Sequence, residues 1–193
     1  MKKLTQFGVR DPVALMEALY NAGQNAIIDI IKTSSAPEER KQLRTWGINA
    51  VAEMIGRSPN TIRALEEKGL IASPGKDEGG RKQYTLELIN KIRELTGAKF
   101  NKPDNTDPII CCTLNFKGGV GKSMTSLLLL QYLAMNGMRV LGVDLDPQAT
   151  LTTWFGFIPD IDLNEDDTLA TALLEDANDI KRVIRKTYFT GID

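Results

Sequence analysis

A short glycine-rich segment, residues 117–123, sets the strongest constraint on how this chain can fold. It reads Lys-Gly-Gly-Val-Gly-Lys-Ser, after an apolar run, 109–114, and before a helix-forming run, 124–133. Glycines let backbone N–H groups turn toward a phosphate, Lys122 supplies charge to the β- and γ-phosphates, and the Ser123 hydroxyl can bind Mg²⁺. Strand, loop and helix together predict an ATP site. Its expected contacts are Lys117, Gly118, Gly119, Val120, Gly121, Lys122, Ser123 and Met124.

The loop departs from the usual pattern G-x-x-x-x-G-K-[ST] at its first position. Phe116 stands where the first glycine is expected, and a second lysine, Lys117, begins the loop. Lys117 is poorly placed to turn back onto its own phosphates beside Lys122. It is better placed to neutralise a nucleotide held by a facing subunit, as an arginine finger does. The alternative is a chance glycine cluster, which the K-[ST] ending and the flanking elements disfavour.

A second motif follows where a βαβ unit would place it. Residues 139–143 predict a short buried parallel strand, which is followed by Asp-Leu-Asp-Pro-Gln at 144–148. Ligands in parallel sheets bind beyond the carboxyl ends of the strands, so both carboxylates are expected beside the glycine loop. Asp144 suits the water shell of Mg²⁺, and Asp146 suits the placing of an attacking water. Taken alone, the motif is more often a capped turn.

These two motifs together resemble the deviant Walker A ATPases of the ParA/SopA group, over residues 107–193. The resemblance implies that Lys117 acts in trans, that Lys122 binds phosphate, and that Asp146 lies at the hydrolytic water. It also implies that Ser123 and Asp144 hold the metal, that the cofactors are ATP or ADP with Mg²⁺, and that ATP pairs two subunits face to face. Residues 165–174 resemble the short helix that these proteins carry next.

Composition excludes several other kinds of site. The 193 residues contain no histidine, which removes serine triads and histidine acid–base catalysis. Cys111 and Cys112 are neighbours, so a disulfide between them would be strained, and we expect small buried residues in a reducing cytosol. The sequence has no apolar run long enough to cross a bilayer and no signal-peptide core at its start, so we expect no membrane partner.

The net charge of −1 hides a sharp division along the chain. Residues 40–102 hold thirteen Lys and Arg against seven Asp and Glu, whereas residues 103–193 hold seven against thirteen. A basic segment joined to an acidic one indicates that the basic segment meets a polyanion. The boundary is expected at 102–108, where prolines and turn-forming residues interrupt both patterns.

The basic segment has the order of a helix-turn-helix. Residues 48–55 predict a short helix ending at Gly56, Ser58-Pro59 predicts a cap and a first-turn proline, and 61–68 predicts the second helix. Residues 70–84 predict a hairpin with a glycine tip that carries cations. Such a hairpin is called a wing. Residues 86–95 predict a further helix. In a helix-turn-helix the second helix enters the major groove of DNA.

Residues 48–95 resemble the MerR-like winged helix, which some ParA/SopA proteins of large plasmids carry before the ATPase. The resemblance makes one set of side chains candidates for the groove: Arg57, Asn60, Thr61 and Arg63. A second set, on the wing, is expected to contact phosphates: Lys76, Arg81 and Lys82. The alternative is a small helical domain whose cations form a solvated face.

The first segment predicts one amphipathic helix, from Asp11 to Lys32, followed by a linker at 33–37. A lone helix must bury its apolar stripe somewhere. It can pack on its own domain or pair with the same helix of another subunit. A two-fold dimer would match a palindromic operator.

The expected fold is α/β, in three parts: an N-terminal helix, with dimerisation as one of its two possible roles (1–36), a winged helix-turn-helix (40–101) and an incomplete P-loop domain with a parallel sheet (107–193). The last part lacks a Walker B strand, so alone it is not expected to hydrolyse ATP efficiently.

The resemblance implies an ATP-dependent partition protein that also represses its own operon, in the cytoplasm on the nucleoid. Its implied partners are operator DNA, non-specific DNA, a centromere-binding partition protein and a second copy. The alternative is a repressor with a vestigial or truncated nucleotide site. A nitrogenase-type reductase is disfavoured because its bridging cysteines are absent, and replication-linked ATPases remain possible relatives.

Overall fold

The structure is a computed structural model that describes residues 11–33, 41–99, 107–175 and 177–193. The chain separates into two units, Met1–Ala36 and Pro37–Asp193, which are described here one at a time. Most of the predicted linker (34–37) and most of the predicted boundary (102–106) lie outside the described residues.

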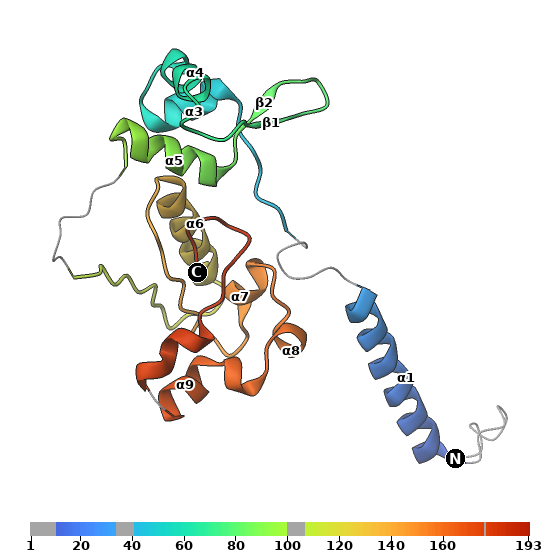
Figure 1. Ribbon diagram of the computed structural model, residues 1–193. Coiled ribbons are helices and arrows are strands. Elements are labelled where there is room, and N and C mark those ends of the chain that lie inside the picture. The colour runs from blue at the N-terminus through green and yellow to red at the C-terminus, as the bar shows by residue number, and fades with distance from the viewer. Residues whose placement is uncertain (1–10, 34–40, 100–106, 176) are drawn as a thin grey trace. The chain divides into compact units, whose positions relative to one another are not determined.

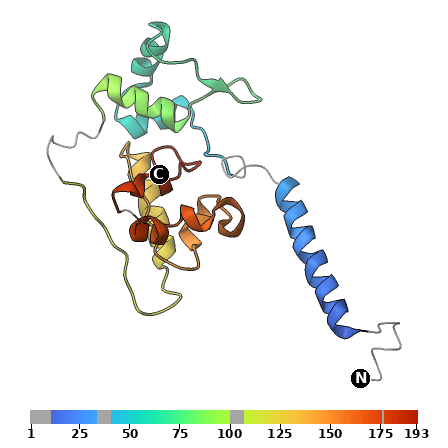
Figure 2. The ribbon, with the colours of Figure 1, turned by 60° about the horizontal axis from the view of Figure 1, so that its bottom comes forward.

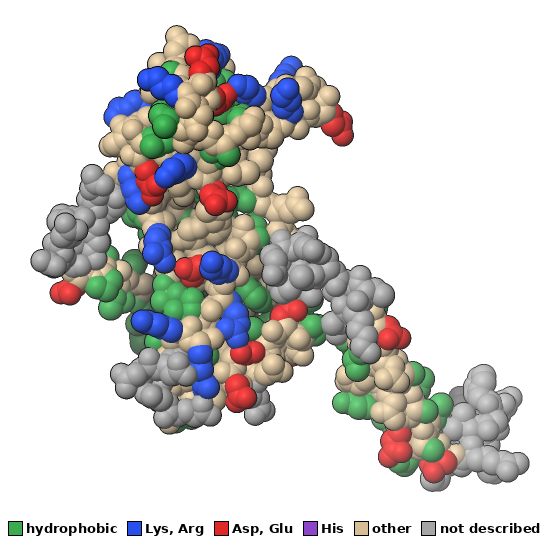
Figure 3. Space-filling view, viewed as in Figure 1, with side chains coloured by type: hydrophobic (Ala, Val, Ile, Leu, Met, Phe, Trp, Pro, Cys, Tyr) green, Lys and Arg blue, Asp and Glu red, His purple; other side chains and the backbone are tan. Residues whose placement is uncertain are grey.

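The first unit contains helix α1, Pro12–Thr33, as the sequence predicts. Asp11 caps it, because its Oδ1 accepts hydrogen bonds from the backbone N–H of Val13 (2.9 Å) and Ala14 (3.4 Å). The apolar stripe is largely exposed: Met16 is 72% and Ile30 68% exposed. Figure 3 shows hydrophobic side chains along this helix. Among the helices that the structure describes, none has both the length and the apolar character needed to cross a bilayer.

Two short helices begin the second unit, and local signals set their ends. Helix α3, Ile48–Ile55, ends at Gly56, whose φ of 63° is the left-handed conformation that favours glycine. Helix α4, Pro59–Glu67, begins two residues before the predicted position because Pro59 already occupies its first turn. Ser58 caps α4 by accepting a hydrogen bond from the backbone N–H of Thr61. The helix-turn-helix order is therefore present in the fold.

A hairpin and a third helix complete this region (Figure 1). Strands β1, Gly75–Lys76, and β2, Lys82–Gln83, pair antiparallel, with Gly75 opposite Gln83. Trp46 extends the pairing, since its backbone N–H and C=O bond to the C=O and N–H of Tyr84 at 3.0 and 2.8 Å. Helix α5, Leu86–Thr96, follows, capped by Thr85 and ended by Gly97.

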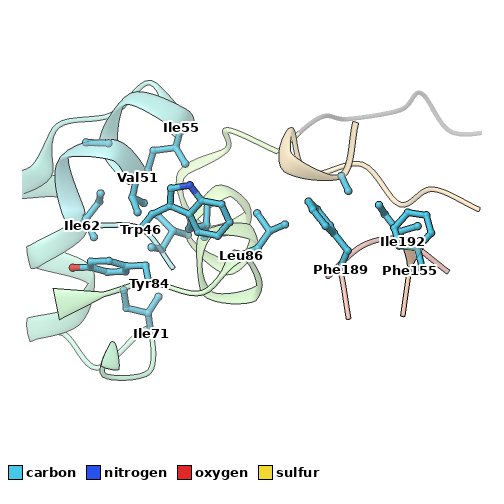
Figure 4. Packing of buried hydrophobic residues seen from close by; sticks show 14 of the residues in the cluster. Trp46, Val51, Ile55, Ile62, Ile71, Tyr84, Leu86, Phe155, Phe189 and Ile192 are labelled. Atoms are coloured by element: carbon cyan, nitrogen blue, oxygen red, sulfur yellow. The ribbon is translucent and has the colours of Figure 1, made fainter. Parts of the chain in front are cut away.

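The core of this region is closed and apolar. Val51, Ile62 and Tyr84 have no exposed surface, and Leu86 has 1%. Figure 4 shows Trp46 and Tyr84 among these aliphatic side chains. At roughly 1.5–3 kcal/mol for each fully buried large side chain, this cluster is the main source of stability for the helices and the hairpin.

The predicted nucleotide-binding segment, residues 107–193, contains one long helix, α6, Lys122–Met135. Helix α7, Thr150–Trp154, contacts α6. The later elements are α8, Pro159–Asp162; η2, a 3-10 helix at Glu165–Asp167; α9, Leu169–Glu175; and η3, a 3-10 helix at Ala177–Val183.

The predicted parallel sheet is not confirmed here. Residues 109–114 run as an extended trace in Figures 1 and 2, and Ile109, Ile110 and Leu114 are 93%, 89% and 76% exposed. Of run 139–143, Val140 forms one parallel bridge, with Ile192, while Leu141 and Val143 are each 53% exposed. A strand is held by hydrogen bonds to its neighbours, and no strand lies beside 109–114 in the described part of the chain.

The cysteine prediction is wrong for the same reason. Cys111 and Cys112 were expected to be buried in this strand, and both are exposed.

Candidate functional site

The glycine loop has the backbone shape that a phosphate cradle needs. Gly119 and Gly121 have φ angles of 70° and 83°, a conformation that side-chain-bearing residues rarely adopt. Helix α6 begins immediately after Gly121, whose C=O accepts the first helical hydrogen bond, from Thr125 (2.8 Å). The unpaired N–H groups of the first helical turn and the helix dipole therefore lie directly behind the loop.

The two lysines of the loop lie differently. The Lys122 ammonium donates a hydrogen bond to the backbone C=O of Lys117 at 3.3 Å, so it already lies over the loop. The backbone N–H of Lys117 is held by the side chain of Asn115 (2.9 Å), whereas its side chain is exposed. Lys117 is thus anchored at its main chain with its ammonium directed into solvent.

The remaining cradle residues are accessible. Ser123 is half-buried at the start of α6, and the side chains of Val120 and Met124 are exposed. Gly118 is exposed as well. Farther along α6, the Ser126 hydroxyl bonds to that of Thr113 (3.1 Å), which fastens the helix to the extended run before the loop.

The acidic motif forms a capped turn at the start of α7. The Asp144 Oδ2 accepts hydrogen bonds from the backbone N–H and the hydroxyl of Thr152, both at 2.9 Å. The Asp144 Oδ1 accepts from the N–H of Asp146 (3.2 Å), and the Asp146 Oδ1 accepts from the N–H of Gln148 (3.0 Å). Ala149, with φ 49°, takes the left-handed turn into α7. The turn positions both carboxylates by their own local bonds.

The glycine loop and the acidic turn begin two helices that contact each other, α6 and α7. No hydrogen bond among the described residues joins the two motifs directly. Their donor set fits Mg²⁺, which prefers carboxylate and hydroxyl oxygens and keeps several waters. The Asp144 Oδ2 already accepts two hydrogen bonds, but its Oδ1 accepts only one and keeps a lone pair for such a water. The Asp146 Oδ1 likewise accepts one bond, and Asp146 is exposed.

The predicted groove residues lie at the start of α4, and their side chains bond to one another or to the backbone. The Asn60 Oδ1 accepts a hydrogen bond from the Arg63 guanidinium (2.7 Å), and the hydroxyls of Thr61 and Ser58 lie 3.0 Å apart. Asn60 and Arg63 are exposed. Arg57 differs, because its guanidinium donates to the C=O of Thr96 (2.9 Å) at the end of α5.

The hairpin carries the other three predicted cations. Lys76 and Arg81 are exposed, and the backbone N–H of Arg81 bonds to the carboxylate of Asp77 (2.8 Å). The Lys82 ammonium forms an ion pair with Glu66 of α4. Figure 3 shows Lys and Arg side chains on both the helices and the hairpin of this region.

Glu66 is a site residue that sequence reasoning missed. Its side chain is 10% exposed and accepts hydrogen bonds from the Lys82 ammonium and the Tyr84 hydroxyl. Burial pushes the pKa of Glu66 upward, but those two hydrogen bonds and the charges of Lys82 and Arg63 outweigh it and lower the pKa. Burial, with the bond to Glu66, raises the pKa of Tyr84. The sequence signal is that Glu66 lies four residues after buried Ile62, on one helix face.

Sequence reasoning also missed two cations, and the side chain of each donates a hydrogen bond to the last carbonyl of a helix. Arg93 of α5 is 2% exposed and donates to Asn90 Oδ1 (2.6 Å) and to the C=O of Met135, the last residue of α6 (2.5 Å). Burial lowers its pKa. Lys41 donates to the C=O of Trp154, the last residue of α7 (2.5 Å). The periodicity places Arg93 four residues after buried Ile89, which was the available signal.

Comparison with known protein families matches both regions. Residues 111–190 match the CobQ/CobB/MinD/ParA nucleotide binding domain, which includes the glycine loop and the acidic turn. Residues 47–84 match the MerR family regulatory protein, which includes α3, α4 and the hairpin.

Individual proteins resemble the chain over the same regions. Protein SopA of Escherichia coli K12 is 34% identical over 93% of this chain and 49% of its own length. A putative replication protein A of Sinorhizobium fredii is 33% identical over 81% of this chain and 41% of its own. The HTH-type transcriptional regulator CueR of Escherichia coli O6:H1 is 36% identical over 27% of this chain and 38% of its own.

The chain spans about half the length of SopA, and the match runs through both motifs of the nucleotide-binding segment and through the helix-turn-helix. The chain therefore contains a ParA-type nucleotide-binding segment and a MerR-like segment, and it is similar to SopA over most of its own length.

Proposed function

We propose that this chain acts in ATP-dependent plasmid partition and binds its own operator DNA to repress the partition operon. The observation that carries the proposal is the glycine loop, where two left-handed glycines, the first turn of α6 and the Lys122 ammonium converge. Such a loop binds phosphate through backbone N–H groups and one point charge. The similarity to SopA supports the same reading.

The nucleotide site is assigned to residues 107–193, with ATP or ADP and Mg²⁺ as cofactors. Lys122 binds the β- and γ-phosphates, Ser123 binds the metal, and Asp144 holds its water shell. Asp146 positions the attacking water. Lys117, anchored by Asn115 with its ammonium in solvent, acts on the nucleotide of a facing subunit. Hydrolysis is proposed for a chain of the length of the relatives.

The DNA site is assigned to residues 40–101 as a winged helix-turn-helix. The exposed pair Asn60 and Arg63 lies at the N-terminal end of α4, where a recognition helix contacts bases. Thr61 lies between the two in the sequence, and Arg57 precedes them. The hairpin acts as the wing, with Lys76 and Arg81 as phosphate contacts. Lys82 contributes less because Glu66 neutralises it.

The stripe of α1 suits a second copy of the chain, since its large apolar side chains are exposed within residues 1–36. A homodimer would present two helices to a palindromic operator. Non-specific DNA of the nucleoid and a centromere-binding partition protein complete the proposed partners.

A second function has one observation in its favour. The apolar side chains of run 109–114 are exposed, and no strand among the described residues pairs with it, although a P-loop needs a strand behind it to hold its shape. In that case residues 40–101 act as a transcriptional repressor and the nucleotide site is vestigial.

One pair of measurements separates the two functions. Calorimetric titration of the purified chain with ADP and with Mg²⁺–ATP measures nucleotide binding, and gel retardation of the duplex upstream of its coding sequence measures operator binding. Binding of both ligands supports the partition proposal. Retardation without nucleotide binding selects the repressor, and the absence of both refutes the two proposals together.

A further inference from the structure

Two cations of the DNA-binding segment end at the C-terminal carbonyls of the two helices that carry the nucleotide motifs. Arg93 of α5 donates to the C=O of Met135 at the end of α6. Lys41 donates to the C=O of Trp154 at the end of α7, and its ammonium also lies 6.0 Å from the centre of the Tyr188 ring. The last carbonyls of a helix lack intrahelical partners and carry the negative end of its dipole, so a cation is the natural ligand there.

The surroundings of Arg93 are specific to its buried guanidinium. The side chain is 2% exposed, and a guanidinium so buried requires hydrogen-bond partners, which Asn90 and Met135 supply. Gly137, just after α6, has φ 85°, and a Cβ on it would approach the Arg93 Cδ to 3.2 Å. The end of α6 is thus shaped around Arg93, with glycine at the point of closest approach.

The opposite ends of these helices hold the nucleotide motifs. Helix α6 begins at Lys122, directly after the glycine loop, and its 14 residues span about 20 Å at 1.5 Å per residue. Helix α7 begins at Thr150, and its Thr152 bonds to Asp144 of the acidic turn. A rigid helix therefore runs from each nucleotide motif to a cation of the DNA-binding segment.

The apolar core continues across the same junction. One cluster of buried side chains includes Tyr84 and Leu86 from the DNA-binding segment and Phe189 and Ile192 from the nucleotide-binding segment. Figure 4 shows Leu86 between the group around Trp46 and the side chain of Phe189. Close-packed interiors transmit displacement because they leave little room for independent movement.

We propose that Arg93 and Lys41 are positioning residues that transmit the nucleotide state to the DNA-binding segment, through the C-terminal ends of α6 and α7. A nucleotide that shifts the N-terminal end of either helix alters the distance from its last carbonyl to the cation. The two states then differ in this contact, which is the differential interaction that any coupling between two sites requires. This inference rests on the proposed function.

The test is the effect of nucleotide on DNA affinity in the variant Arg93→Gln, made in the complete chain. The dissociation constant for the upstream duplex is measured without nucleotide, with ADP and with Mg²⁺–ATP. In the unmodified chain we expect nucleotide to change the affinity by roughly 5- to 150-fold, the usual range of coupling. The ratio of the dissociation constants measured without and with nucleotide should fall toward 1 in Arg93→Gln, although nucleotide and DNA each still bind.

Two further variants separate transmission from mere stability. Arg93→Lys keeps the charge and a single donor nitrogen, and it should keep part of the nucleotide effect that Arg93→Gln loses. Lys91→Gln, at an exposed position on the same helix that pairs with Glu94, leaves the ratio unchanged. Circular dichroism shows whether Arg93→Gln folds. If it does not, Lys41→Gln tests the inference instead, and it should lower the same ratio through its contact with α7 alone.

A measurement without any ligand checks the contact itself. Amide hydrogen exchange at residues 136–138, whose N–H groups bond back to α6, should quicken in Arg93→Gln and not in Lys91→Gln.

The inference is overturned if folded Arg93→Gln and Lys41→Gln both keep the full effect of nucleotide on DNA affinity. It is also overturned if the unmodified chain binds nucleotide and DNA but its DNA affinity is the same with and without nucleotide. Those results leave the proposed function standing. Failure of the unmodified chain to bind nucleotide or DNA removes the proposed function, and the inference falls with it.

Discussion

The DNA-binding segment, residues 40–101, and the nucleotide-binding segment, residues 107–193, differ in how far along the chain their stabilising contacts reach. The first closes its core within about fifty residues: Val51, Ile62 and Tyr84 are fully buried. The second places its motifs on α6 and α7 but leaves the apolar run 109–114 exposed. Helices and a tight hairpin find their hydrogen bonds within a few residues, whereas a parallel strand finds them only on a distant segment.

The difference separates two kinds of sequence information. A cap, a proline or a glycine acts on its own neighbourhood, so it works in either region: Ser58 caps α4, and Gly121 starts α6. An apolar run reports only that a surface will be buried, and not what will bury it. The comparison therefore turns on whether the nucleotide loop functions while its supporting run is exposed.

The largest contrast is expected from paired truncations of one apolar side chain in each region. Ile62→Ala opens a cavity in the closed core and should cost about 2–5 kcal/mol of unfolding free energy. Leu114→Ala removes a side chain that is 76% exposed and should change that free energy by less than about 0.5 kcal/mol. Urea denaturation measures both. A large cost at Leu114 would mean that run 109–114 is packed in solution and that the two regions do not differ.

The second contrast lies within the loop itself. Lys122→Ala removes the charge proposed to meet the phosphates and should weaken nucleotide binding by about 100-fold, or roughly 3 kcal/mol. Lys117→Ala should leave binding within a few-fold, because its side chain points into solvent. Calorimetric titration with ADP compares the two variants.

The same pair of variants tests the trans role of Lys117. Nucleotide-dependent dimerisation, followed by light scattering with Mg²⁺–ATP, should be lost in both. Equal loss of ADP binding in the two variants would remove the trans role.

The third prediction concerns the ion pair that fastens the hairpin to α4. Glu66→Gln weakens the bonds to Lys82 and Tyr84 and should cost about 1–3 kcal/mol. The neighbouring Glu67→Gln, at an exposed position, is the control and should cost less than about 0.5 kcal/mol.

The pH dependence of stability gives a separate test of Glu66. Folding lowers its pKa from the ordinary value of 4.5, so the ionised form stabilises the fold. That contribution is present above pH 4.5 and is lost as the pH falls through the lowered pKa. Unfolding free energies measured across this range should decline more steeply in the unmodified chain than in Glu66→Gln. Equal slopes would show that the carboxylate makes no such contact.

The last contrast lies in DNA binding, where no effect is expected to exceed that of Glu66→Gln on stability. Arg63→Ala should cost about 1–3 kcal/mol on the operator and less on unrelated DNA. Lys76→Ala should weaken binding to both alike and reduce the salt slope by about 1, since its ammonium has no partner among the described residues. Lys82→Ala should change the slope less, because Glu66 already neutralises that charge. Fluorescence anisotropy in a salt titration measures all three, and equal slopes for Lys76 and Lys82 would contradict the ion pair's role.

The sequence predicted most of the fold where signals are local. Helix α3 has the predicted bounds, the hairpin lies inside the predicted 70–84, and α5 extends the predicted helix by one residue. The ends of α4 and α6 differ by one or two residues, because Pro59 and Lys122 already adopt helical backbone in the first turn.

The site was predicted as motifs but not as a network. Glycine spacing revealed the loop, and Asp144 and Asp146 revealed the acidic turn. Helical spacing placed Glu66 and Arg93 on the apolar faces of their helices, but it did not show which partner would hold either charge, so both were missed. Their partners lie 16 and 42 residues away, at Lys82 and Met135.

The backbone pairing of Trp46 with Tyr84 has a mechanical consequence. Thr45 adds a bond from its hydroxyl to the side chain of Gln83 (3.0 Å), so the chain entering this region is fastened beside the base of the hairpin. A pulling force applied ahead of Thr45 would load these bonds before it reached α3 or α4. The base of the hairpin would therefore carry such a load first, and α3 and α4 would keep their mutual geometry.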